Sequence, residues 1–223
     1  MRRKEKEQAQ VELEHIILED FDSKLLNEKP FTEKDLYLYY ALYSDIIVQY
    51  LRLTVSNELR PLANEVRAVL GHLTEQNTDS HVDQRELEKA YGHMRRLTLD
   101  AFKILCDEYD GFFVKTMMKQ YHYNFNSVNV GYLQKYSTLY IEANRAYTTA
   151  QQFEKTGSDS TSKDNIIRLY HIAAKKYIEL KQLYFKNKKE INKVRLKTKI
   201  LIGATVGSFA FSTIVSVLTL ILS

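Results

Sequence analysis

Residues 200–223 read ILIGATVGSFAFSTIVSVLTLILS, a run of 24 residues that contains neither a charged residue nor a proline. As an α-helix with a rise of about 1.5 Å per residue, this run would be about 36 Å long, enough to cross a hydrocarbon core of about 30 Å with some tilt. It lies at the wrong end of the chain for a signal peptide, and Met1–Lys6 leads into no apolar segment. The sequence therefore predicts one C-terminal transmembrane helix over 200–223.

The residues that directly precede the apolar run are strongly basic and indicate the orientation of the helix. Because lysine and arginine beside a span are retained on the cytoplasmic side, we expect residues 1–199 to be cytoplasmic and Ser223 to lie at the far face. The same charges attract anionic lipid headgroups, which makes them candidates for contact with the membrane surface. They are Lys186, Lys188, Lys189, Lys193, Arg195, Lys197 and Lys199, opposed only by Glu190.

The composition of the rest of the chain excludes several classes of protein. The whole chain has 32 Lys+Arg against 28 Asp+Glu, but without the seven basic residues and one acidic residue of 186–199 the balance becomes 25 against 27, a net charge of −2. A generally basic surface of the kind that binds nucleic-acid phosphates is therefore not indicated. A single cysteine, Cys106, excludes an internal disulfide and a cysteine-rich metal site.

Helical periodicity predicts an all-α fold, because apolar residues recur at helical spacing while two prolines and seven glycines leave little material for turns. Residues 1–156 are expected to form a cytoplasmic bundle of long helices. The expected helices cover 4–27, 32–73, 82–121 and, after a loop near 124–129, a segment that carries Tyr132 to Tyr147.

Three local signals determine how these helices should begin, end and join. Pro61 should end or kink the second helix, and Asp110–Gly111 marks a place where the third could break. The small polar stretch 157–163 is typical of a linker. After it, the helical pattern restarts at Asp164 and meets no glycine or proline until Gly203. We therefore expect a long helix over 164–199, basic at its juxtamembrane end, that continues from the bundle into the membrane.

The aromatic content, 16 Tyr and 10 Phe with no Trp, has two interpretations. Tyrosines at helical spacing could present stacking faces to nucleobases. Such spacing is more typical of a bundle core or subunit interface with hydroxyls at its wet edge. The residues concerned are Tyr132, Tyr136, Tyr140 and Tyr147 in one helix, and Tyr170, Tyr177 and Tyr184 in the next.

The chain carries no motif for catalysis or cofactor binding, so we expect a protein that is not an enzyme and needs neither cofactor nor metal. It has no GxxxxGK[ST], GxGxxG, HExxH or GxSxG pattern, and its six histidines show no metal-ligand spacing. The alternative is a ribonuclease. Arg67-Ala-Val-Leu-Gly-His72 resembles the Arg-x4–6-His pattern of the helical HEPN ribonucleases, in which the two residues act together on RNA at a dimer interface.

A candidate ligand site is a cationic cluster around Tyr91 within one expected helix. Lys89, His93, Arg95 and Arg96 could bind an anion or a nucleotide. Arg95 and Arg96 point about 100° apart, so only one of them can share a face with Lys89 or His93. The alternative is an ordinary solvated helix face.

The residues of the expected membrane helix are arranged by type on separate faces, which a simple membrane anchor does not require. With successive residues about 100° apart, six hydroxyl-bearing residues fall within an arc of about 80° and form one continuous seam. They are Thr205, Ser208, Ser212, Ser216, Thr219 and Ser223, which we call the hydroxyl stripe. Three small residues, Gly203, Gly207 and Ala210, lie on the opposite side.

Three interpretations of the hydroxyl stripe compete. Each hydroxyl could bond back to a carbonyl of its own helix and face lipid, in which case the stripe has no function. The stripe could instead be a packing seam that, with Gly203-x-x-x-Gly207, allows close approach in a dimer. In the third interpretation, three or more copies turn the stripe inward and enclose a pore. A ring of uncharged hydroxyls would pass water and small ions with little charge selectivity.

The domain order and the chemistry of the span resemble the single-span membrane effectors of bacterial antiphage systems, in which a cytoplasmic sensing domain controls an oligomeric pore. The channel component of the Hailong-type systems is similar; its partner is a nucleotidyltransferase whose short DNA oligomers hold the channel shut. The resemblance implies a homo-oligomeric, gated, ion-permeable pore that is regulated by a nucleotidyltransferase or an oligonucleotide ligand. The alternative from another class is a tail-anchored scaffold or tethering protein without conduction.

Thiol labelling tests the predicted orientation. In a Cys106→Ala background, a cysteine at Ser223 should react with a membrane-impermeant reagent added outside the cell. A cysteine placed within 157–163 should react only after the membrane is permeabilised, because the basic flank keeps that part of the chain inside. The reverse pattern of labelling would overturn the orientation and with it any cytoplasmic sensor.

Overall fold

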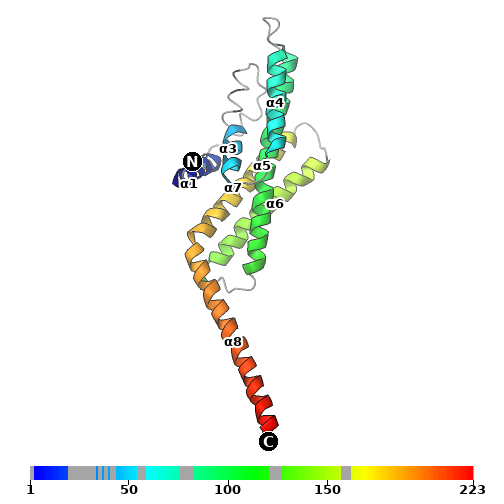
Figure 1. The fold of residues 1–223 in the computed structure, drawn as a ribbon. Coiled ribbons are helices and arrows are strands. Elements are labelled where there is room, and N and C mark those ends of the chain that lie inside the picture. Colours follow the sequence, from blue (N-terminus) through cyan, green and yellow to red (C-terminus); the bar gives the residue numbers. More distant parts are fainter. Residues whose placement is uncertain are drawn as a thin grey trace.

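The computed structural model describes residues 3–19, 34, 37, 40, 44–54, 59–75, 83–120, 127–156 and 162–222. Within these ranges the chain forms seven α-helices and no strand, which confirms the all-α prediction. The helices are α1 (Arg3–Glu19), α3 (Asp45–Thr54), α4 (Arg60–Glu75), α5 (Gln84–Gln120), α6 (Tyr132–Thr156), α7 (Ser162–Lys186) and α8 (Lys188–Leu222). The first six pack as a bundle, and α8 projects from its lower end (Figure 1).

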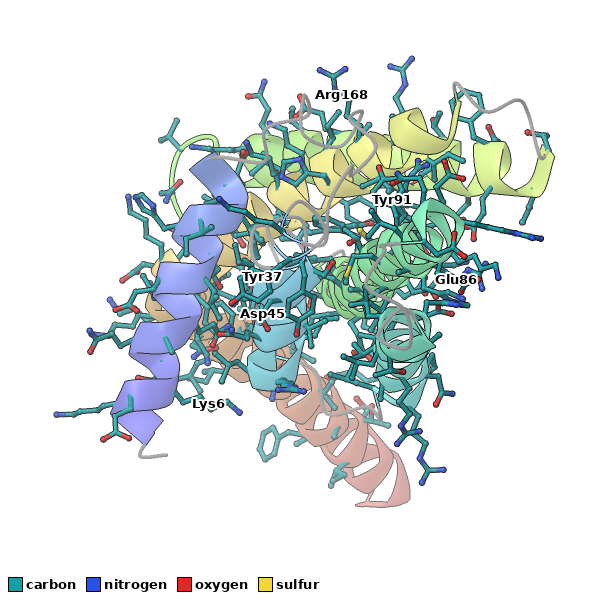
Figure 2. The ribbon with its side chains drawn as sticks, turned by 90° about the horizontal axis from the view of Figure 1, so that it is seen from above. Lys6, Tyr37, Asp45, Glu86, Tyr91 and Arg168 are labelled. Atoms are coloured by element: carbon teal, nitrogen blue, oxygen red, sulfur yellow. The ribbon has the colours of Figure 1, made fainter. Side chains whose placement is uncertain are left out.

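Helix α5 is the central element of the bundle. It contacts α3, α4, α6 and α7, while α6 and α7 form a hairpin with the most extensive contact of any helix pair. Seen from above, α1 and α4 lie on opposite sides of the bundle, and α6 and α7 run along a third side (Figure 2). Helix α1 packs mainly on α3 and reaches α7.

Two local expectations for this bundle are corrected by the structure. Pro61 neither ends nor kinks a helix; it lies in the first turn of α4, where a missing N–H costs nothing. Helix α5 continues through Asp110–Gly111 without a break. A glycine inside a helix costs about 1 kcal/mol relative to alanine, and the burial of neighbours such as Phe113 outweighs that cost.

The tyrosines form the core of the bundle, which confirms the second interpretation of their spacing. Six of the seven that share helical spacing are less than a tenth exposed, and Tyr140 is half-buried. Four of the hydroxyls donate to carboxylates, those of Tyr140, Tyr147, Tyr170 and Tyr177. Asp110 on α5 accepts hydrogen bonds from Tyr177 at 2.8 Å and from Tyr140 at 3.1 Å. One turn earlier, Asp107 accepts from Tyr147, and burial raises the pKa of Asp107 above its usual value.

A second polar group joins helices that lie far apart in the sequence. Glu14 on α1 is 5% exposed and forms an ion pair with Lys181 on α7. The same carboxylate accepts hydrogen bonds from Tyr50 on α3 at 2.9 Å and from Gln182 at 3.2 Å. The hydroxyl of Tyr50 also contacts that of Tyr109 on α5. The buried charge is therefore matched by a cation and satisfied by hydrogen bonds, as burial requires.

The expected unbroken helix from residue 164 into the apolar run is interrupted once, at Asn187. Its backbone N–H points to the carbonyls of both Leu183 and Tyr184, at 3.3 and 3.2 Å, and its side chain donates to the Leu183 carbonyl at 2.9 Å. The side-chain carbonyl of Asn187 accepts a hydrogen bond of 2.7 Å from Asn129. Asn187 therefore ends α7, and α8 leaves at an angle to it (Figure 1). The start of α7 at Ser162 places the last two residues of the expected linker in a helix, and 157–161 lie outside the described residues.

The buried ion pair can be tested by its effect on stability. Lys181→Met should lower the free energy of unfolding by about 3–5 kcal/mol, because it leaves the Glu14 carboxylate buried without a cation. Glu14→Gln in addition should recover part of that loss. As a control, Lys176→Met on the same helix removes two ion pairs, with Glu142 and Glu179, that remain accessible to solvent, and it should cost less than about 1 kcal/mol. Denaturation in one detergent provides the measurement, and equal costs for both lysines would contradict the assigned role.

Candidate functional site in the membrane-spanning helix

Helix α8 is, among the described residues, the one helix that is long and apolar enough to cross a membrane. None of the apolar window that meets this criterion is buried against the rest of the chain. Apolar side chains such as Phe209 and Phe211 are 77% and 69% exposed. A helix that presents this much apolar surface on every side fits a lipid environment rather than water.

The hydroxyl stripe lies along the exposed part of α8, and three of its four described hydroxyls bond within their own helix. Thr205 donates to the carbonyl of Leu201, Ser208 to that of Thr205 and Ser216 to that of Ser212, each at 2.9 Å. Thr219 lies in α8, but its side chain is outside the described set, as is the whole of Ser223. These bonds satisfy the hydroxyls in a single copy, and a rotation about χ1 would free them for water or a neighbouring helix.

The small residues on the opposite face of α8 leave its backbone open. A Cβ added at Gly203 or at Gly207 would meet no other atom within 4 Å. Ala210 is exposed on the same side. Such a face permits another helix to approach closely, which is how small residues promote association in membranes.

The structure separates the basic residues before the span into two groups. Six lysines are exposed, of which Lys188 lies 5.1 Å from the centre of the Phe185 ring and Lys193 pairs with Glu190 at 2.7 Å. The exposed lysines are Lys186, Lys188, Lys189, Lys193, Lys197 and Lys199. Arg195 is instead half-buried beside Tyr132, close enough for its charge to counteract the burial that raises the pKa of that tyrosine. Arg195 is therefore directed to the bundle.

The cationic cluster on α5 is interleaved with carboxylates that sequence spacing did not reveal. Lys89 pairs with Glu86 on its own helix, while His93 lies 2.7 Å and Arg96 3.6 Å from the carboxylate of Glu65 on α4. Arg95 lies 5.8 Å from the centre of the Tyr91 ring. Figure 2 shows Glu86 at the outer side of α5, while Tyr91, which is 8% exposed, lies farther inward. An anion bound here would have to displace Glu65 or Glu86.

The two residues of the ribonuclease-like pattern point to different partners. Arg67 donates to the side chain of Asn64 at 3.1 Å. His72 lies 2.7 Å from Glu86, whose pKa is lowered by hydrogen bonds from Lys89 and His72, and its ring stacks on His93 with centroids 5.3 Å apart. Only His72 therefore takes part in the contact between α4 and α5, whereas Arg67 bonds within α4.

An apolar groove between α4 and α5 was not predicted from the sequence. It has a volume of about 320 Å³ and is lined by Tyr37, Tyr40, Val66, Val69, Leu70, Leu73 and Met94. Leu70 and Tyr37 are 56% and 69% exposed. The apolar stripe on 62–73 could have indicated this groove, but the same stripe also predicts ordinary helix packing, so the sequence does not distinguish the two.

Comparisons of this chain with known protein families, with curated proteins and with solved structures give no match. Its function must therefore be inferred from its own residues.

Size measurements test the role of the small-residue face. Gly203→Leu or Gly207→Leu should reduce the mass of any oligomer in detergent, because each adds a large side chain where two backbones would touch. Thr213→Leu, on neither the small-residue face nor the hydroxyl stripe, is the control and should leave the mass unchanged. If both glycine variants keep the wild-type mass, that face has no part in assembly.

Proposed function

We propose that the protein is an oligomeric membrane effector whose α8 helices form an ion-permeable pore, gated by the helical bundle. The observation that carries the proposal is the hydroxyl stripe, which continues for the length of the apolar run on one face while apolar side chains cover most of the remainder. With three or more copies, the stripes would line a lumen. The hydroxyls in that lumen would lower the free energy needed to place water and small ions inside the bilayer.

Two further features support a pore with a controlled opening. The small-residue face opposite the stripe offers a surface for a neighbouring copy, so lumen and packing surface would lie on separate sides of the same helix. Helix α8 is joined to α7 through one residue, Asn187, rather than through a flexible tether. A rearrangement of the bundle would therefore act directly on the direction of α8.

In this proposal the bundle lies in the cytoplasm, the exposed lysines contact anionic lipid, and release from inhibition depolarises the cell. Antiphage defence is the biological setting that we propose, with a nucleotidyltransferase or an oligonucleotide as the regulator. The carboxylates beside Lys89 and His93 mean that an anionic regulator would bind there only if it displaced Glu65 or Glu86.

The second candidate function is a membrane-anchored scaffold or tether without conduction. It is favoured by the back-bonded hydroxyls of Thr205, Ser208 and Ser216, because this arrangement lets a hydroxyl face lipid at little cost. The two candidates differ in one measurable property, which is ion flux.

Flux from liposomes that contain the purified protein separates the two functions. Ser212→Leu with Ser216→Leu should abolish flux by dewetting the lumen and leave insertion intact, because leucine is more favourable than serine in lipid. The matched control, Ile214→Leu with Val217→Leu, changes residues away from the stripe and should conduct as the wild type does. Toxicity on overexpression should follow the same order.

Equal flux from the serine double variant and the wild type would refute the hydroxyl-lined pore. An absence of flux from every variant, together with intact insertion, would favour the scaffold.

A further inference from the structure

The first turns of α8, before the apolar run, are buried on one face only. Ile191 is fully buried and Val194 is 9% exposed, while Thr198 is half-buried. On the opposite side, Leu196 is 60% exposed, and Lys193 is exposed as well. One face of this part of α8 therefore packs against the bundle and the other is free of it.

The buried face of α8 continues into the hydroxyl stripe. With Thr205 at 0° and about 100° per residue, the stripe spans roughly 300° to 20°. On the same scale Ile191 lies at about 40°, Val194 at about 340° and Leu196 at about 180°. At the start of α8 the bundle therefore lies on the side to which the hydroxyls point, and the rest of α8 projects below the bundle (Figure 1).

The segment that meets this face of α8 is held in a defined position. Asn129 donates to Asn187 at 2.7 Å at the junction of α7 and α8. A tight turn follows, in which the N–H of Tyr132 bonds to the carbonyl of Asn129 at 3.2 Å and Gly131 has a φ of 80°, a value that favours glycine. Tyr132 is 1% exposed, and Arg195 lies near it. The turn and α8 are thus fixed to one another.

This placement conflicts with a narrow ring of α8 helices whose stripes face inward. In such a ring, whatever lies on the hydroxyl side of α8 lies over the central axis. A single helix with its side chains is about 10–12 Å across, and each copy would bring a bundle several helices wide to the same place. The bundles would overlap, so the ring cannot close while Ile191 and Val194 remain buried against the bundle.

We propose that the contact between the 128–132 turn and α8 is autoinhibitory, and that α8 must swing away from the bundle about Asn187 before the pore forms. This inference rests on the proposed pore function. The contact involves only the first turns of α8, where Asn129 bonds to Asn187 and where Ile191 and Val194 are buried, so a regulator bound to the bundle can shift the balance between the two arrangements.

Reversible cross-linking tests whether the contact inhibits. In a Cys106→Ala background, Asn129→Cys with Asn187→Cys places two thiols at the joint, and a reducible methanethiosulfonate reagent with one methylene spans side chains that meet end to end. Cross-linked protein in liposomes should show at least about ten-fold less ion flux than the same protein after reduction. Thr148→Cys with Gln152→Cys, both exposed on α6, is the control, and its flux should not respond to the reagent.

A second pair of variants opens the contact without a cross-linker. Val194→Asp places a charge in the buried face and should raise flux several-fold above that of the wild type. Leu196→Asp adds the same charge on the free face and should leave flux at the wild-type value. Circular dichroism in the same detergent checks that both variants keep the helical bundle.

The outcomes separate this inference from the pore itself. Flux that is equal before and after reduction, or equal in Val194→Asp and the wild type, overturns the autoinhibitory contact and leaves the pore standing. If the wild type, Val194→Asp and the reduced double-cysteine protein all fail to conduct, the pore proposal falls, and the inference falls with it.

Discussion

The carboxylates on α5 impose the constraint on which the arrangement of the bundle depends. A helix at the centre of a bundle has few faces that reach water, yet α5 carries Asp107 and Asp110 toward its neighbours. Tyrosine hydroxyls from α6 and α7 supply the donors that these carboxylates need. Because the three helices must align for the bonds to form, the polar contacts fix their relative register, while the tyrosine rings provide most of the apolar contact.

Polar contacts also attach α1 and α3 to the bundle, and here they include an ion pair between a buried carboxylate and a lysine. Glu14 is buried and its partner Lys181 is partly buried, and desolvation offsets most of the attraction in a pair of this kind, which therefore contributes specificity more than net stability. Removing either partner would leave a charge that nothing else compensates. The position of α1, a largely polar helix of 17 residues, is therefore set by this carboxylate together with the buried side chain of Ile17.

The helical bundle is connected to α8 through a single residue, Asn187. A flexible linker would isolate the two, whereas the single interruption at Asn187 makes the direction of α8 a property of the bundle's lower end. Hydroxyl stripe, small-residue face and buried face are all features of one helix, and their relative angles follow from helix geometry alone. In the proposed function, a pore and an inhibitory contact on the same face of α8 could not form at the same time, and this conflict would be the physical basis for gating.

The sequence by itself determined the features that depend on local periodicity. The apolar run, the hydroxyl stripe, the all-α class and the tyrosine spacing can each be derived from residues a few positions apart. Two features needed the tertiary structure because their partners are distant in the chain. Glu14 meets Lys181 across most of the sequence, and Asn187 ends α7 where Asn129 reaches it. Periodicity carries no information about such pairs, so neither the joint nor the side of α8 that the bundle covers could be read from the sequence.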